Sequence, residues 1–343
     1  MIPAWKDFLL DQGAVLDGDR VEHFSDIRVE LSAVRNQAVL ADVSNSALLV
    51  ASGEDAASFL HGQFTNDVLK LAAGRLQWNG YCSPKGRLLA TFLLWKEGDH
   101  YLMQLPATVQ EPVQKRLGMF VLRAKVKLAD ASTASIRLGL AGAGAAALIE
   151  EVCKVGAPAP RSLAGAEPIT VLGLGENRYE IIAAGVEIAQ RLWHALASHV
   201  VKVGAGRWDW LGIRAGEAQI TKPTQEQFVP QMVNLDWLGG VNFRKGCYPG
   251  QEIVARTQYL GRLKRRMYLV NIDTEGAAAG DELFSPDLEG QACGMLVDAA
   301  PSPDGGIDAL AVMQIESALN QPVHFQSPTG PLARLLPLPY ALP

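Results

Sequence analysis

The sequence contains few cysteines and no long apolar run. Its four cysteines are far apart: Cys82, Cys153, Cys247 and Cys293. The absence of a Cys-x-x-Cys pair argues against a zinc knuckle, and the wide spacing argues against a disulfide framework. The longest apolar stretch, near residues 88–95, is too short to span a membrane. Asp7 and Asp11 interrupt the first segment before it could serve as a signal peptide, so we expect a cytoplasmic protein without a membrane partner.

Charge is also modest. The net charge is -5 and charged residues make up 20% of the chain, a mild acidity that argues against a protein coated by nucleic acid over its whole surface. A net charge of this size still allows one local basic patch on the surface. The 343 residues, 48% of them hydrophobic, are enough to form two or three globular domains.

The order of expected elements repeats along the chain. Residues 135–140, 143–153, 169–172, 179–182, 186–198 and 200–203 alternate as strand, helix, strand, strand, helix and strand, which is the split ferredoxin-like unit. An earlier segment has a similar order, with strands expected at 47–51, 76–81, 87–95, 100–105 and 124–128 and helices at 54–61 and after Pro106. From Arg265 onward, short strands separated by Gly, Pro and Asp indicate a small β-barrel.

These patterns predict an α+β protein with two ferredoxin-like antiparallel α/β domains and a carboxyl-terminal small β-barrel. The expected boundaries are 1–130, 131–260 and 261–343. Gly142-Ala-Gly144-Ala-Ala-Ala147 fits a dinucleotide-binding fingerprint. However, the following strands form a tight hairpin and carry no acidic residue for a ribose. We therefore interpret the motif as a strand-to-helix turn and expect no NAD site.

Cys247 has surroundings that favour its thiolate. It follows Arg244 and Lys245, and residues 251–256 after Pro249 are expected to be helical. Cations and a helix amino terminus both stabilise a thiolate, the form required of a nucleophile or a sulfur or metal ligand. The alternative is that Cys247 is a small buried apolar residue, as most free cysteines are.

The segment Lys245-Gly-Cys-Tyr-x-Gly-Gln-Glu252 resembles the signature of the YgfZ family. Further similar segments are Gly62-Gln-x-Thr65-x-Asp67-Val68, Pro84-Lys85-Gly86-Arg87 and Leu336-Pro-x-Pro-Tyr340. The resemblance covers the whole chain and implies three domains around a central opening, related to the aminomethyltransferase of the glycine cleavage system. In such folds the first two domains exchange segments, so the linear boundaries are approximate.

The resemblance also implies a function and a set of site residues. Family members bind folate and support iron-sulfur proteins and tRNA modification. Carried over to this chain, the functional thiol is Cys247, accompanied by Lys245, Gln251 and Glu252. Aminomethyltransferases carry an aspartate pair after a glycine turn, whereas this chain has Leu89 and Ala90 in that stretch. Because these side chains cannot transfer protons, we expect no aminomethyltransferase activity.

Two positions are candidates for contacting the folate. Trp208 matches a family tryptophan and offers a flat ring for stacking, although it could equally fill a seam between domains, as we expect for Trp210. Ser46 stands where relatives have a second aromatic residue, which predicts a looser pocket. Arg214 stands where relatives commonly have a glutamate that could hold the pterin, and no metal ligands are expected.

A basic cluster lies between Arg244 and Arg266. It has seven cationic residues against Glu252: Arg244, Lys245, Arg256, Arg262, Lys264, Arg265 and Arg266. The cluster could hold a phosphate backbone or a polyglutamate folate tail, or it could be a solvated hinge. Direct contact with tRNA is the weaker hypothesis, because the cluster lacks interleaved aromatic residues.

Three classes of function remain. The first, which we favour, is a monomeric folate-binding accessory protein that binds tetrahydrofolate and serves iron-sulfur client enzymes, including those that methylthiolate tRNA, through Cys247. The second is a folate-dependent one-carbon transferase, against which the missing aspartates argue. The third is a non-catalytic RNA-binding or scaffold protein, which would need the basic cluster but not the thiol.

Overall fold

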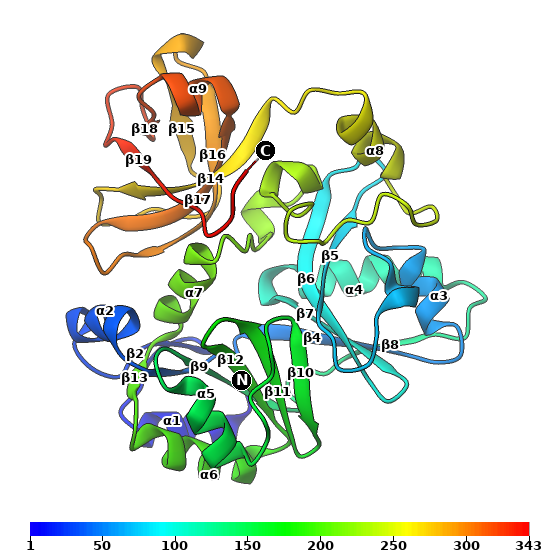
Figure 1. Cartoon of the computed structure of the whole chain (residues 1–343), viewed down its shortest axis with the longest axis vertical. Helices are drawn as coiled ribbons and strands as arrows, with labels where there is room; N and C mark the ends of the chain where they lie inside the picture. Colours follow the sequence, from blue (N-terminus) through cyan, green and yellow to red (C-terminus); the bar gives the residue numbers. More distant parts are fainter. Residues whose placement is uncertain (343) are drawn as a thin grey trace.

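Three sheets of five or six strands surround the centre of the molecule, as shown in the computed structural model (Figure 1). The structure describes residues 1–342. One sheet and its helices occupy the right of Figure 1, a second occupies the bottom, and the third lies at the upper left. Helix α7 (Ala205–Arg214) lies between the second and third sheets. The mixture of helices with antiparallel sheets confirms the predicted α+β class.

The first sheet has five antiparallel strands in the order β5-β6-β7-β4-β8. Their bounds are β4 (Ser46–Ser52), β5 (Gln77–Cys82), β6 (Leu88–Glu97), β7 (His100–Pro106) and β8 (Lys127–Asp130). Helices α3 (Ala56–His61) and α4 (Ala107–Val121) pack on one face of this sheet. In α4, Val109, Val113 and Leu117 recur at helical spacing and are buried in the same apolar cluster as strand residues.

The second sheet has six strands in the order β10-β11-β12-β9-β3-β13. They are β3 (Val39–Asp42), β9 (Ile136–Ala141), β10 (Ser162–Ala166), β11 (Ile169–Gly175), β12 (Arg178–Ala183) and β13 (Val201–Val203). The accompanying helices are α5 (Ala145–Leu148), the π-helix Ile149–Cys153 and α6 (Val186–Ala197). Strand β3 pairs antiparallel with β9 and parallel with β13, so it separates these two strands.

The amino-terminal segment belongs to this second sheet. It comprises α1 (Pro3–Asp11), the hairpin of β1 (Val15–Asp17) and β2 (Arg20–His23), α2 (Ile27–Asn36) and β3. Trp5 packs edge-on against Trp193 of α6, and its indole nitrogen donates a hydrogen bond to Asp42 at 2.9 Å. The expected first domain, 1–130, is therefore divided between two sheets.

The Gly142-x-Gly144 turn joins β9 to α5. A Cβ on Gly142 would lie 2.3 Å from the backbone oxygen of Gln37, and its φ is +104°, so only glycine fits there. The strands that pair with β9 are both antiparallel to it. Gly142 thus permits a close approach between neighbouring backbones, in a sheet arrangement unlike the parallel one that the fingerprint requires.

The third sheet is a curled antiparallel half-barrel in the order β18-β15-β16-β17-β14-β19. Its elements are β14 (Arg265–Ile272), β15 (Glu282–Phe284), the 3-10 turn Pro286–Leu288, β16 (Ala292–Pro301), β17 (Ile307–Gln314), α9 (Ile315–Asn320), β18 (His324–Phe325) and β19 (Ala333–Leu336). An isolated bridge between His324 and Leu332 brings the two edges of the sheet together. The expected small barrel is thus present as a curled sheet.

The connection to the half-barrel contains short helical turns. After α7 come the 3-10 turns Lys222–Thr224 and Pro230–Val233 and helix α8 (Gln251–Tyr259), while another 3-10 turn, Val68–Lys70, follows α3. Of the helices formed by residues 1–342, none is both long and apolar enough to cross a membrane.

Candidate functional site

The segment 245–252 is held against the first sheet by Lys245. Its buried ammonium donates hydrogen bonds to the backbone oxygens of His61 and Phe64, the latter at 2.6 Å, and lies 4.9 Å from the ring centre of Tyr248. Burial lowers the pKa of Lys245 to about 8, opposed by electrostatic attraction to Asp67 and Cys247. Lys245 therefore anchors this segment to the end of α3.

Two glycines let this segment approach the hairpin turn between β5 and β6. A Cβ on Gly250, whose φ is +80°, would lie 2.5 Å from the Cα of Gly86. A Cβ on Gly86 would in turn lie 2.9 Å from the Cβ of Ile253. The hydroxyl of Thr65 donates a hydrogen bond to the oxygen of Gly240 at 2.6 Å. Together with the hydrogen bond from Lys245 to Phe64, the glycine contacts bring three sequence motifs that are far apart in the chain, 62–68, 84–87 and 245–252, to one place.

Cys247 is exposed in this segment, whereas Cys82, Cys153 and Cys293 are buried. Burial raises the pKa of Cys153 and of Cys293 to about 11, and it raises the pKa of Cys82 further still. The interpretation of Cys247 as a buried apolar residue is therefore wrong. Only this thiol is open to a partner among the four.

Gln251 and Glu252 begin helix α8 beside the thiol. The Gln251 side chain donates a hydrogen bond to the backbone oxygen of Lys245 at 3.4 Å, which ties the start of the helix to the preceding loop. Glu252 is exposed. The imidazole of His61 is also a neighbour of this segment, although the motif did not indicate it. Its Nε2 lies 3.6 Å from the position that a Cβ on Gly246 would take. Its Nδ1 lies 3.2 Å from Asp67, while burial, followed by the Lys245 charge, lowers the pKa of His61.

A separate cavity of about 650 Å³ contains both candidate folate residues, Trp208 and Ser46. Its walls come from the first sheet, the second sheet, α7 and the half-barrel, the last through Asp298. The indole of Trp208 lies over Gly139, where a Cβ would be 2.6 Å from the ring carbon Cε3. The absence of a side chain at position 139 thus allows the ring to lie against strand β9.

Polar side chains line this cavity from several elements. Gln104 donates hydrogen bonds to Ser46 at 3.2 Å and to Glu180 at 2.9 Å, while its own Oε1 is buried without a partner among the described residues. Burial raises the pKa of Glu180, against the opposing effect of Arg137. Burial, followed by repulsion from Asp209, raises the pKa of Asp298 to about 8.

Arginines provide the opposite charge in the cavity. Arg20 pairs with Asp209 at 2.7 Å, and Arg178 pairs with Glu217 and donates a hydrogen bond to the oxygen of Leu211 at 3.0 Å. Neither Arg178 nor Glu180 was expected from the sequence to be a site residue. The signal was present, because both are charged residues within an otherwise apolar strand, and buried charges require partners.

Other residues singled out from the sequence lie outside this cavity. The lining residues include none of the segment 245–252, to which Cys247 belongs, and neither Leu89 nor Ala90. Trp210 is buried in a seam, where its indole nitrogen donates a hydrogen bond to Asp308 of the half-barrel at 2.9 Å. Arg214 lies 3.6 Å from the same carboxylate.

The basic cluster is smaller than the sequence indicated. Arg266 is buried and pairs with Asp236 at 3.3 Å, and Lys245 is occupied by backbone oxygens. The members that remain exposed are Arg244, Arg256, Arg262, Lys264 and Arg265. Tyr340 of the last motif lies elsewhere, with its hydroxyl donating a hydrogen bond to Gly216 at 3.0 Å.

Comparison with known proteins identifies the class. The fold is that of the glycine cleavage system aminomethyltransferase T from Bartonella henselae, with a TM-score of 0.81 and 18% identity over 96% of this chain and 94% of that one. Residues 13–242 match the GCVT N-terminal domain family.

Relatives narrow this class to one family. The chain is 30% identical to the tRNA-modifying protein YgfZ of Edwardsiella ictaluri, over 84% of this chain and 88% of that protein. It is 28% identical to the tRNA-modifying protein YgfZ of Cronobacter sakazakii, over 92% of this chain and 97% of that protein. The chain belongs to the YgfZ family, as the segment 245–252 predicted.

Proposed function

We propose that this protein binds tetrahydrofolate in the large cavity and supports iron-sulfur enzymes, including those that modify tRNA, through the exposed thiol of Cys247. The observation that carries the proposal is that Trp208 and Ser46, which are far apart in the chain, line one cavity of about 650 Å³. This volume is within the range of small-molecule sites, roughly 300–1,000 Å³. The names of the relatives, tRNA-modifying proteins, support the tRNA part of the proposal.

The chemistry of the lining residues fits a folate. A pterin is flat, which suits the ring face of Trp208. Its several N–H donors suit the carboxyls of Glu180 and Asp298 and the Oε1 of Gln104, which has no hydrogen-bond partner in residues 1–342. The anionic glutamate tail of folate suits an arginine such as Arg178. When bound, tetrahydrofolate would supply a one-carbon carrier.

Aminomethyl transfer is not part of the proposed function. Leu89 and Ala90 offer no proton-transferring group, and neither residue lines the cavity. The exposed Cys247 lies outside the cavity wall, at the meeting point of three sequence motifs, where a partner protein can reach it. Folate binding and the thiol are therefore two separate sites in this proposal.

A calorimetric titration with tetrahydrofolate tests the folate site. The expected result is saturable binding that Trp208→Leu weakens by about tenfold or more, because the variant loses the stacking surface. Trp210→Phe is the matched control, since Trp210 lies in the seam with the half-barrel. Aminomethyl transfer assayed in parallel should stay at background. Absence of binding at millimolar ligand, or appreciable transfer, would overturn the proposal.

A further inference from the structure

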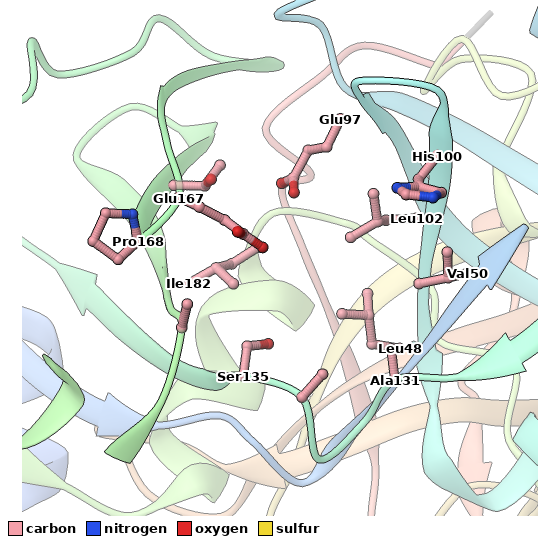
Figure 2. Close-up of a pocket in the computed structure, with 13 residues that line it drawn as sticks. Leu48, Val50, Glu97, His100, Leu102, Ala131, Ser135, Glu167, Pro168 and Ile182 are labelled. Carbon is pink, nitrogen blue, oxygen red and sulfur yellow. The ribbon is translucent and has the colours of Figure 1, made fainter. Parts of the chain in front are cut away.

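A second, smaller cavity lies in the seam between the first two sheets. Its volume is about 180 Å³, on the order of six water volumes. Its apolar floor comes from Leu48 and Leu102 of the first sheet and Ile182 of the second. Figure 2 shows these side chains around an open space, with Glu97 and His100 on one side and Glu167 and Pro168 on the other.

The two cavities are neighbours along the same strands. Ser46, Gln104 and Glu180 line the large cavity, whereas Leu48, Leu102 and Ile182 line the small one. Leu48 and Ile182 come two residues later in β4 and β12, and Leu102 comes two residues earlier in the antiparallel strand β7. Residues two apart lie on the same face of a strand, about 7 Å apart. The small cavity is therefore a distinct site on the same seam, and it is lined by different residues.

Three oxygen-bearing groups are directed into the small cavity. Figure 2 shows the carboxylates of Glu97 and Glu167 and the hydroxyl of Ser135 pointing into the open space. Ser135 is only 8% exposed, and its buried Oγ has no hydrogen-bond partner among the described residues. Glu97 accepts one hydrogen bond, from Trp95 to Oε1 at 2.9 Å, which leaves Oε2 available. A buried hydroxyl without a partner costs free energy unless a ligand satisfies it.

The charge of the lining selects the ligand class. The residues that line this cavity include two carboxylates but neither lysine nor arginine. Within residues 1–342 no group of three or more His, Cys, Asp or Glu is arranged to hold a metal ion. An ammonium group supplies the donors that carboxylates and a hydroxyl accept, and a short alkyl chain fits the apolar floor.

We propose that the small cavity binds a short primary alkylammonium ion, with its ammonium between Glu97, Glu167 and Ser135 and its alkyl chain on Leu48, Leu102 and Ile182. Glu167 and Pro168 are exposed at the mouth, so the ligand reaches the cavity from solvent. The same chemical group could come from a free amine or from a lysine side chain of another protein, and a free amine and a capped lysine distinguish these two sources.

The test uses the full chain and n-butylammonium, followed by ligand-observed NMR and calorimetry. We expect a Kd on the order of 1 mM, the affinity that a ligand of about five heavy atoms can reach. The neutral 1-butanol, which has the same length, should bind about tenfold more weakly, because it lacks the charge. Capped lysine with both backbone ends blocked should bind with equal strength if a protein side chain is the source, and not at all if the source is a free amine.

The variant Glu97→Gln with Glu167→Gln should weaken n-butylammonium binding by about tenfold or more, since hydrogen bonds to charged groups are lost. The matched control, Glu176→Gln with Glu275→Gln, removes the same charge at exposed positions outside the cavity. Ser135→Ala should weaken binding while leaving the melting temperature of the free protein unchanged or higher. No binding at 20-fold the expected Kd, or equal binding by the two double variants, would overturn the proposal. So would a Ser135→Ala protein that melts lower yet binds the amine normally.

Discussion

The backbone of Gly139 lies directly against the indole of Trp208, so closely that a Cβ at this position would be 2.6 Å from ring carbon Cε3. Because real Cβ contacts are longer than this, Gly139→Ala must move the ring. We expect tetrahydrofolate affinity to fall by about tenfold or more, and the free energy of unfolding to fall by about 1–3 kcal/mol through overpacking. Calorimetric titration and thermal melting measure the two effects.

Gly118→Ala is the matched control for this change. Gly118 lies in α4, and a Cβ there meets nothing within 4 Å. This variant should be neutral or more stable by about 0.5–1 kcal/mol, because alanine favours a helix more than glycine does, and it should bind tetrahydrofolate as the parent does. If Gly139→Ala also binds normally, the position of the indole does not matter to the folate site.

The buried Lys245 gives stability an unusual pH dependence. Its pKa is lowered from 10.5 to about 8, mainly by burial. Below pH 8 both the folded and unfolded states carry the proton, so the full cost of burying the charge is present. Between pH 8 and pH 10.5 the unfolded state binds more protons, so the free energy of unfolding rises with pH. Relative to Lys245→Met, the parent should gain roughly 2 kcal/mol between pH 8 and pH 10.

Urea unfolding at several pH values checks this prediction, because both proteins share every other titrating group. Arg244→Met serves as the control, since Arg244 is exposed and should change stability by no more than about 0.5 kcal/mol at any pH. Parallel curves for the parent and Lys245→Met would contradict the placement of a charged ammonium against the oxygens of His61 and Phe64.

Cys247 should be alkylated before the other three cysteines. It is exposed, whereas Cys82, Cys153 and Cys293 are buried, and burial raises the pKa of all three buried thiols. Iodoacetamide reacts only with thiolates that it can reach. At pH 7.5 it should therefore label Cys247 at least about tenfold faster than any of the three buried cysteines. Peptide mass spectrometry over time measures the four rates. Comparable labelling of Cys153 in the folded protein would mean that the π-helix opens readily.

The sequence predicted elements whose signals are local. Helix α3 and strand β4 were expected at 54–61 and 47–51 and occur at Ala56–His61 and Ser46–Ser52. The place of the first 42 residues could not be predicted, because β3 is a strand of four residues whose partners, β9 and β13, are distant in the chain. Its signal is too short to stand out, and its location depends on nonlocal pairing.

The candidate site was predictable in part for a similar reason. The motifs identified the residues 62–68, 84–87 and 245–252 separately, but their meeting depends on contacts such as Gly86 against Gly250, which spacing does not reveal. The residue types Trp208 and Ser46 indicated a folate pocket only through the family resemblance. Asp298 is the one charged residue of strand β16, but nothing in the sequence indicates that it reaches the large cavity from the half-barrel.

The last prediction separates the accessory protein from an RNA-binding scaffold. Cys247→Ala removes one exposed sulfur and leaves the contacts of Lys245 and Gln251 in place, so folate affinity should persist and the melting temperature should stay within a few degrees of the parent. In cells that contain only this variant, tRNA methylthiolation and iron-sulfur enzyme activity should fall to the level of cells that lack the protein. Cys293→Ala is unsuitable as a control, because Cys293 is buried in the half-barrel core.

The Cys247→Ala variant is compared with a variant in which the charges of the exposed Arg262, Lys264 and Arg265 are reversed. Arg266 stays unchanged, since it is buried against Asp236 and its loss would disturb the fold. Reversal should weaken any polyanion contact in a salt-dependent way, because counterion release sets that energy, and we expect partial methylthiolation activity to remain. The reverse outcome, with Cys247 dispensable and the three cations essential, would favour an RNA-binding scaffold, because that function needs the positive surface and has no use for the thiol.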